Sequence, residues 1–386
     1  MKRVLLSIIA TICGTLLMAQ DLSQFKALDD SLFLNNEAYV NGNKYQRDAM
    51  LFVDMLSDTH PYYIKKERRE QLFAGEKALL AKCAACDNDS DFVSLLIETL
   101  GDLHDKHTDV IDLKQLSEKR KAAQQQQQAL DEPSDAVMAN WGDLFHYIIF
   151  PERQLCYLQF NQCADARTMG NEYLPRWDTM LDEMFAEMKE NGIKNLIVDA
   201  QYNNGGSSML CDELLIRLRP FEQLRTLTSS LRFSRLMGAY NPRIAIAKQS
   251  WEADGHIDEL YPMPAGAVGP DFVQPEVFEG NVIFVQGEKT YSSAGILMTL
   301  ARDNHIGIIA GSNSTFSPSH YGEILPYRLP NTDIIGTISC KFFARPDAEH
   351  VDDKTLVPDV ALDLSDKEEL WDEILKIIDN NAKTSK

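Results

Sequence analysis

The sequence has few basic residues, few cysteines and only one long apolar run. Lysine and arginine number 38 against 58 aspartate and glutamate residues, so the formal net charge is −20. Because phosphate backbones and anionic lipids repel a chain this acidic, we expect no nucleic-acid partner and no binding to an anionic membrane surface. The 7 cysteines are too sparse to predict a disulfide framework.

The one long apolar run lies at the N-terminus. It extends from Val4 to Met18 after two basic residues, and Ala19 precedes a polar stretch. At roughly fifteen residues it is shorter than the about twenty that span a bilayer. The pattern predicts a secretory signal peptide in residues 1–20 and export to the periplasm or the extracellular space. No later segment is apolar enough to predict a membrane span.

Metal-binding motifs are also scarce. Cys83 and Cys86 have the spacing of a ligand pair, but no second Cys or His pair lies at zinc-finger distance. We interpret the two cysteines as small residues at the end of an amphipathic helix. The sequence therefore predicts no metal site and no cofactor.

Residues 21–112 have the apolar periodicity of helices and are predicted to form a helical N-terminal domain. One helix should stop at His60-Pro61, because proline disfavours the helical conformation in the residue before it. Another is predicted over Glu67–Lys82. A third should begin after Ser90, which would be its N-cap.

Residues 113–140 contain a polyglutamine run and a cluster of helix breakers, which is typical of a polar linker. From residue 141 to 365, strands and helices alternate, which predicts an α/β domain with parallel strands and active groups at the strand ends. Residues 366–386 are predicted to form a C-terminal helix. The strands expected are Leu155–Phe160, Asn195–Ala200, Val282–Val285 and Ile306–Ala310.

One loop of this α/β region exposes its backbone. Asn203-Asn204-Gly205-Gly206 lies between the buried strand that ends at Ala200 and the next predicted helix. N–H groups that no side chain screens suit the oxyanion that develops in acyl transfer. A purely structural turn would use the same residues, so the loop is a candidate oxyanion hole only beside a nucleophile.

A candidate nucleophile stands at the start of a helix predicted to begin at Ser293. Ser292 precedes that helix directly. A serine in this place commonly caps the helix, but a helix N-terminus also favours the negative charge that develops on a nucleophile. Such a serine needs a base. His107, within an Asp-x-His-Thr pattern, is our candidate because histidine accepts a proton near neutral pH.

Together these segments resemble the tail-specific (C-terminal processing) protease family of serine peptidases, over roughly residues 40–365. The resemblance implies an α/β fold with a crotonase/ClpP-like core and a helical N-terminal domain, and it implies a peptide or protein substrate. The peptide-binding (PDZ) domain of many relatives is absent. The stretches that carry the resemblance are His107-Thr108, Leu196–Gly206, Thr290–Ala294, Gly311, Tyr321-Gly322, Leu329–Asn331 and Val357–Asp359.

The family has two catalytic arrangements. One pairs the serine with a lysine at the position that Ser317 occupies here, and no lysine occurs between Lys289 and Lys341. The resemblance therefore implies the other, tricorn-like arrangement, with Ser292 as nucleophile and His107 as base.

The remaining roles are also implied by the resemblance. The acid lies just before the Pro-Asp signature, which selects Asp352, with Asp353 and Glu349 as rivals. It would hold the tautomer of the imidazole and stabilise its charged form. The backbone N–H groups of Gly206 and Ser293 would form the oxyanion hole.

Three positions depart from the family pattern. Gln201 replaces a common arginine, and Gly295 and Ser312 each replace a common glutamate. Two functions are therefore weighed: an exported serine-type endopeptidase that works through an acyl-enzyme, and a catalytically inactive relative that binds peptides or apolar ligands. A non-peptidase esterase is a third reading.

Overall fold

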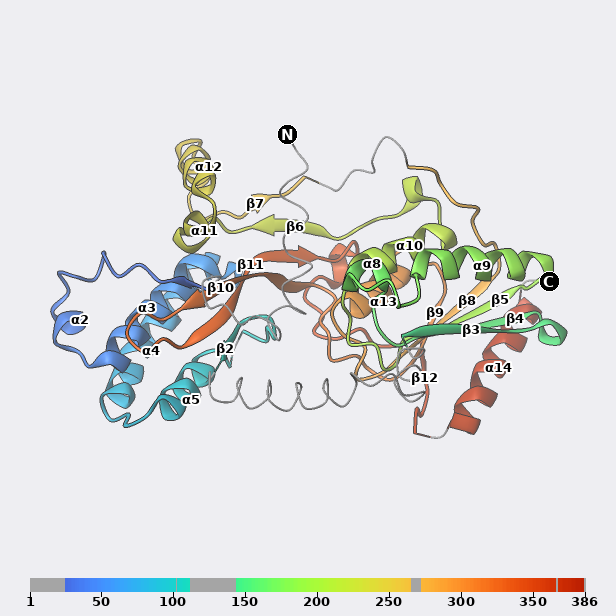
Figure 1. Cartoon of the computed structure of the whole chain (residues 1–386), viewed down its shortest axis with the longest axis horizontal. Helices are drawn as coiled ribbons and strands as arrows, with labels where there is room; N and C mark the ends of the chain where they lie inside the picture. Colours follow the sequence, from blue (N-terminus) through green and yellow to red (C-terminus); the bar gives the residue numbers. More distant parts are fainter. Residues whose placement is uncertain (1–24, 102, 112–143, 265–271, 366, 385–386) are drawn as a thin grey trace. The chain divides into compact units, whose positions relative to one another are not determined.

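A computed structural model of the whole chain is shown in Figure 1. It describes all residues except 1–24, 102, 112–143, 265–271, 366 and 385–386. The predicted signal peptide and polar linker lie outside the described residues. The described residues form two compact units, each with its own sheet. The first unit draws on residues within 1–129, 228–265 and 320–343, and the second on residues within 130–227, 266–319 and 344–386.

Most helices of the first unit come from the N-terminal region. A capping box at Asn43 begins α3, which ends at Thr59 before His60-Pro61, as predicted. Asn88, rather than Ser90, caps α5: the Asn88 side chain accepts from the N–H of Asp91. The helices are α2 (Glu37–Asn41), α3 (Lys44–Thr59), α4 (Lys66–Ala84), α5 (Asp89–Thr99), α11 (Arg235–Tyr240) and α12 (Pro242–Ala253), with the 3-10 turn η2 (Pro61–Ile64).

The sheet of the first unit joins segments that are far apart in the sequence. Its order is β1 (Lys26–Ala27), β10 (His320–Arg328), β11 (Ile335–Ala344), β6 (Thr228–Leu231) and β7 (Tyr261–Pro262), and β2 (Asp109–Ile111) also pairs with β11. Asp109 is opposite Thr337 in the β2–β11 pair. The hydroxyl of Thr337 donates to the carbonyl of His107 at 2.9 Å. The sheet therefore holds the segment that carries His107.

The second unit is built on a mostly parallel sheet. Its order is β12 (Val360–Ala361), β9 (Ile308–Gly311), β8 (Asn281–Gln286), β5 (Asn195–Asp199), β4 (Leu155–Phe160) and β3 (Phe145–Phe150). Only the β3–β4 pair is antiparallel. The four strands expected from the sequence are all present, and the predicted parallel pairing and α/β fold class are confirmed.

Helices cover both faces of this sheet (Figure 1). Leu196 and Val198 of β5 pack in a core with α9 (Trp177–Glu190), α10 (Ser208–Leu218) and α13 (Ser293–Asp303). Ile197, which points to the other face, packs with α14 (Lys367–Thr384). Every residue of β5 is buried, as expected for a parallel strand covered on both sides. The remaining short elements are α8 (Ala166–Met169), η3 (Pro151–Arg153), η4 (Phe221–Gln223) and η5 (Ala348–His350).

The two units do not follow the chain in order. Residues 228–265 and 320–343 lie within the range that the sequence assigned to the α/β domain, yet they fold with the first unit. The physical reason is strand pairing, because β10 pairs with β1 and β11 pairs with β2. In the part of the chain that the structure describes, no helix has the length and apolar character to cross a bilayer.

Candidate active site

The two segments proposed for the chemistry lie at the same edge of the second unit's sheet. β5 and β8 pair in parallel, with Asp199 opposite Val285. Because parallel strands end at a common edge, the loop after β5 and the turn after β8 emerge side by side. α10 and α13 then begin from these two connections. The register of the sheet therefore brings Asn203–Gly206 and Ser292 together.

Ser292 has a backbone conformation that is rare for a residue with a side chain. Its φ is 52° and its ψ is −124°, a region in which non-glycine residues cost roughly 1–3 kcal/mol. Ser292 is the N-cap residue of α13, yet its side chain makes no capping hydrogen bond. The usual structural explanation for a serine here is therefore missing. A strained serine on a sharp strand-to-helix turn is the geometry of a nucleophile elbow.

Gly205 lies directly against this turn. A Cβ at Gly205 would be 2.8 Å from the Cβ of Ser292 and 2.8 Å from the carbonyl oxygen of Tyr291. The two connections are also joined by a hydrogen bond of 3.0 Å from the N–H of Tyr291 to the carbonyl of Asn203. Only glycine permits this close approach, so Gly205 helps to hold Ser292 in its strained conformation.

The predicted donors of the oxyanion hole are the backbone N–H groups of Gly206 and Ser293. A bridge between Cys163 and Gly206 uses the N–H groups of Cys163 and Ser207, at 3.1 and 2.8 Å, and leaves the N–H of Gly206 outside the ladder. Ser293 is the first residue of α13, a position whose N–H has no acceptor within the helix. The hydroxyl of Ser293 donates to the carbonyl of Gly206 at 2.8 Å. The side chain of Ser293 therefore joins the two residues.

Buried side chains hold the glycine loop in place through hydrogen bonds and packing. Asn203 accepts from the N–H of Gly205 at 2.8 Å and donates to the carbonyl of Phe160 at 3.0 Å. The sulfur atoms of Cys163 and Cys211 lie 3.6 Å apart, and Cys211 donates to the carbonyl of Ser293 at 3.3 Å. Both cysteines are free thiols. A hydrogen bond with Cys163 and burial raise the pKa of Cys211, which keeps the thiol neutral.

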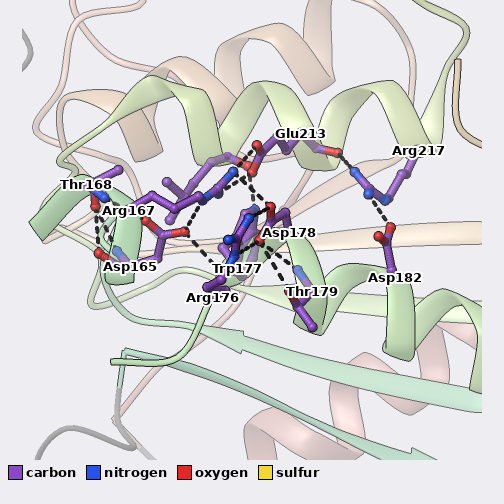
Figure 2. Close-up of polar contacts among 11 residues, drawn as sticks. Asp165, Arg167, Thr168, Arg176, Trp177, Asp178, Thr179, Asp182, Glu213 and Arg217 are labelled. Atoms are coloured by element: carbon purple, nitrogen blue, oxygen red, sulfur yellow. Dashed lines mark hydrogen bonds and ion pairs between the residues drawn. The ribbon is translucent and has the colours of Figure 1, made fainter. Parts of the chain in front are cut away.

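A polar network fixes the segment after Cys163 against α9 and α10 (Figure 2). Arg167 donates to Asp165 at 2.7 Å and forks onto Glu213 of α10 at 2.7 and 2.8 Å. Asp165 also accepts from the backbone N–H of Trp177 at 3.2 Å. The indole N–H of Trp177 donates to the carbonyl of Leu210 at 2.8 Å. The start of α10, and with it the end of the glycine loop, is thereby anchored.

The three positions that depart from the family pattern each have a structural partner in this chain, which at Ser312 is reached through the backbone alone. Gln201 is buried and donates to Asp199 at 2.9 Å. A Cβ at Gly295 would be 2.3 Å from the ring of Phe316, so the ring fills the space of a side chain there. The carbonyl of Ser312 accepts from the side chain of Gln286 at 2.9 Å.

His107 belongs to the first unit, and its partner there is Asp105. The Nδ1 atom of His107 lies 3.2 Å from Oδ1 of Asp105, which also accepts the backbone N–H of His107 at 2.9 Å. The side chain of His107 is 18% exposed, and that of Asp105 is 2% exposed. Our sequence reasoning gave Asp105 no role. A signal was present, because Asp commonly accepts from the backbone two residues further on.

The predicted acid, Asp352, lies in the second unit. It is exposed in the turn after η5, and its side chain has no hydrogen bond or ion pair to another residue in the described part of the chain. Its rival Asp353 lies 3.4 Å from Arg345, which is buried in an ion pair with Asp303. Glu349 is also exposed. The grouping of Ser292 with His107 and Asp352, which spans both units, stays a prediction.

Comparisons with known proteins add independent support for the family. The model of peptidase family S41 matches residues 154–362, a stretch that includes the glycine loop and Ser292. No curated protein sequence matches the chain. Among residues that the structure describes, no group of three or more His, Cys, Asp or Glu side chains is arranged to hold a metal ion.

Solved structures share the fold at low sequence identity. A protein from Parabacteroides merdae ATCC 43184, assigned as a peptidase, is 16% identical with a TM-score of 0.54, over 85% of this chain and 92% of that one. Mature CPAF, complexed with lactacystin, is 12% identical with a TM-score of 0.57, over 87% and 97%. A lipoprotein from Streptococcus agalactiae is 11% identical with a TM-score of 0.50, over 86% and 96%.

These likenesses extend over most of each chain, and at such identities they show a common fold alone. The family match is more specific, because it covers more than half of the 386 residues. It also contains the strand–loop–helix units that place Ser292 beside Gly205. The chain belongs to peptidase family S41, the tail-specific protease family that its motifs predicted.

Proposed function

We propose that the chain is an exported serine-type endopeptidase that cleaves peptides or protein tails through an acyl-enzyme. Ser292 is the nucleophile and His107 is the base. The observation that carries the proposal is the strained backbone of Ser292, whose side chain does not cap α13. Strain of this kind persists only where the surroundings impose it, and it collects at functional sites.

The chemistry follows from the groups at the turn. His107 removes the proton of the Ser292 hydroxyl while the oxygen attacks the peptide carbonyl. The N–H groups of Gly206 and Ser293 stabilise the negative charge on the carbonyl oxygen, a contribution worth about 100- to 1,000-fold in rate for one donor. His107 then protonates the leaving amine, and water hydrolyses the ester left on Ser292. The resemblance gives the role of the acid at this site to Asp352.

Hydrolysis of an unstructured protein tests the proposal. The wild-type chain is incubated with reduced, alkylated casein, and new peptide termini are followed by mass spectrometry. Ser292→Ala should abolish cleavage. Ser293→Ala is the matched control, and it should retain much of the rate because the backbone N–H survives.

The opposite ranking of the two serine variants would show that the nucleophile is Ser293. A wild-type chain that leaves casein intact but still binds peptides would favour the catalytically inactive relative. A chain that cleaves an activated ester but not casein would favour the esterase reading.

Export is proposed from the N-terminal apolar run. When the full chain is produced in a bacterial host with an outer membrane, its intact mass should correspond to cleavage near Ala19, and the protein should be found in the periplasmic fraction. A cytoplasmic protein of full mass would contradict export without affecting the proposed chemistry.

A further inference from the structure

One carboxylate in the first unit lies between two histidines. Asp105 contacts His107 through Oδ1 and His60 through Oδ2, the latter at 3.0 Å from Nε2 of His60. The side chain of Asp105 is 2% exposed and that of His60 is 0% exposed. A buried charge persists only when it is paired and hydrogen-bonded. The donors around Asp105 therefore decide its protonation state.

The far oxygen, Oδ2, receives three donors. The Nδ1 atom of His60 accepts the N–H of Tyr62 at 3.1 Å, so Nε2 carries the ring proton and donates to Asp105. The hydroxyls of Thr108 and Ser339 each donate to Oδ2 at 2.7 Å. The hydroxyl oxygen of Thr108 accepts the N–H of Ser339 at 3.0 Å, which directs its own proton to the carboxylate.

The near oxygen, Oδ1, receives the backbone N–H of His107 and faces Nδ1 of the same residue. We propose that Asp105 is the positioning carboxylate of His107, a role that the resemblance gives to Asp352. Asp105 accepts the Nδ1 proton, which leaves Nε2 as the basic nitrogen of the imidazole. This inference rests on His107 being the base of the proposed function.

The proton balance is simple. When Ser292 attacks, its proton moves to Nε2 of His107, and the Nδ1 proton stays on the ring and points at Asp105. Asp105 is not protonated in this step, because Oδ2 already accepts three donors, and its charge stabilises the imidazolium. The leaving amine later takes the proton from Nε2.

Charges near the pair favour this assignment. Burial raises the pKa of Asp105, but hydrogen bonds from His107 and His60 outweigh it and hold the pKa well below its ordinary value. Burial lowers the pKa of His60, so His60 is a neutral donor. Other titratable or charged groups here include His320, whose ring centre lies 6.4 Å from that of His107, and Tyr63, whose ring centre lies 6.2 Å from that of His60. Tyr321 also lies near the pair, and Arg232 donates to the carbonyl of His60.

The first test reads the tautomer of His107 in the unaltered protein. Nitrogen NMR spectra of the chain labelled at histidine are assigned with a His107→Gln variant. Above the pKa of His107, we expect the proton on Nδ1 and a bare Nε2. A proton on Nε2 would overturn the proposal. This measurement does not depend on activity, so it separates a failure of the inference from a failure of the proposed function.

The second test replaces the charge. In Asp105→Asn the pKa of His107, followed by the same spectra, should fall, because a nearby negative charge favours the imidazolium. The acidic limb of the pH–rate profile should shift to lower pH in the same direction. The plateau should drop by about 10⁴-fold, as when the carboxylate of a serine-protease triad becomes an amide.

Asp48→Asn is the matched control. Asp48 is also a fully buried aspartate of the first unit, but it accepts from Asn331 and Thr332 and contacts no histidine. Asp48→Asn should destabilise the chain and leave the pKa of His107 and the acidic limb in place. If Asp352→Asn moves the pKa of His107 and Asp105→Asn does not, Asp352 is the acid and the proposal is wrong.

Discussion

The backbone conformation of Ser292 and the absence of a side chain at Gly205 are linked by close contact. The serine has a φ of 52°, and the glycine loop packs so closely against it that a Cβ at Gly205 would lie 2.8 Å from the Cβ of Ser292. The sequence already marked both residues, since a glycine pair after a buried strand and a serine before a helix are local patterns. The strain itself could not be predicted, because it arises from contact between two connections that are 87 residues apart, from Gly205 to Ser292.

Gly205→Ala adds only a methyl group, but it should destabilise the turn that carries Ser292. The added Cβ meets the Cβ of Ser292 and the carbonyl of Tyr291 at 2.8 Å each, and overpacking of this kind costs roughly 1–3 kcal/mol. We expect a lower melting temperature and a loss of reactivity at Ser292. Gly192→Ala is the control, because Gly192 also has a positive φ but nothing within 4 Å. It should lose about 1 kcal/mol and keep its reactivity. Equal reactivity in the two variants would contradict the account.

The role proposed for Asp105 could not be predicted from the sequence. Its spacing from His107 predicts a local hydrogen bond, but its role depends on burial and on donors from distant segments, Ser339 among them. Helix boundaries predicted from local patterns can also be wrong by a residue or two. Ser90 and Asn88 are both good N-caps, and the structure uses Asn88 because its side chain reaches the N–H of Asp91 at 3.0 Å.

At the scale of elements, α13 is the helix that follows the proposed nucleophile, Ser292. Most residues of its first turns are buried, and Phe316 packs against Gly295 where the family commonly has glutamate. This helix and the strands β4, β5 and β8 were predictable, because their apolar runs are local and bounded by turn residues. The pairing of β10 with β1 and of β11 with β2 was not, because it joins segments more than a hundred residues apart.

Gly295→Ala tests the packing of α13. Alanine favours a helix over glycine by about 1 kcal/mol, but at Gly295 the Cβ would lie 2.3 Å from the ring of Phe316. We expect a net loss of stability, measured as the melting temperature. The matched control is Gly75→Ala in α4, where nothing lies within 4 Å, and which should be stabilising. A stabilising Gly295→Ala would show that Phe316 moves aside freely.

At the scale of the whole molecule, acid should weaken the first unit through His60 and Asp105. Burial lowers the pKa of His60, so the unfolded chain binds a proton below about pH 6.5 that the folded chain does not. The depressed pKa of Asp105 adds a second such proton below about pH 4. Stability should therefore fall as pH falls, by up to about 1.4 kcal/mol per pH unit for each proton.

Melting temperatures between pH 8 and pH 5 measure this slope. His60→Gln should flatten the part of the slope that lies near pH 6, because glutamine does not titrate. The variant can still donate an amide proton to Asp105, which limits its effect on folding. A slope unchanged by His60→Gln would show that another group takes up the proton.

The central claim is that Ser292 is an activated nucleophile, and covalent labelling tests it most directly. The wild-type chain is treated with a fluorophosphonate, and the adduct is located by peptide mass spectrometry. Our account predicts one adduct on Ser292, absent in Ser292→Ala and in heat-unfolded protein. No adduct on the folded wild-type chain, or an adduct on Ser293 instead, would contradict it.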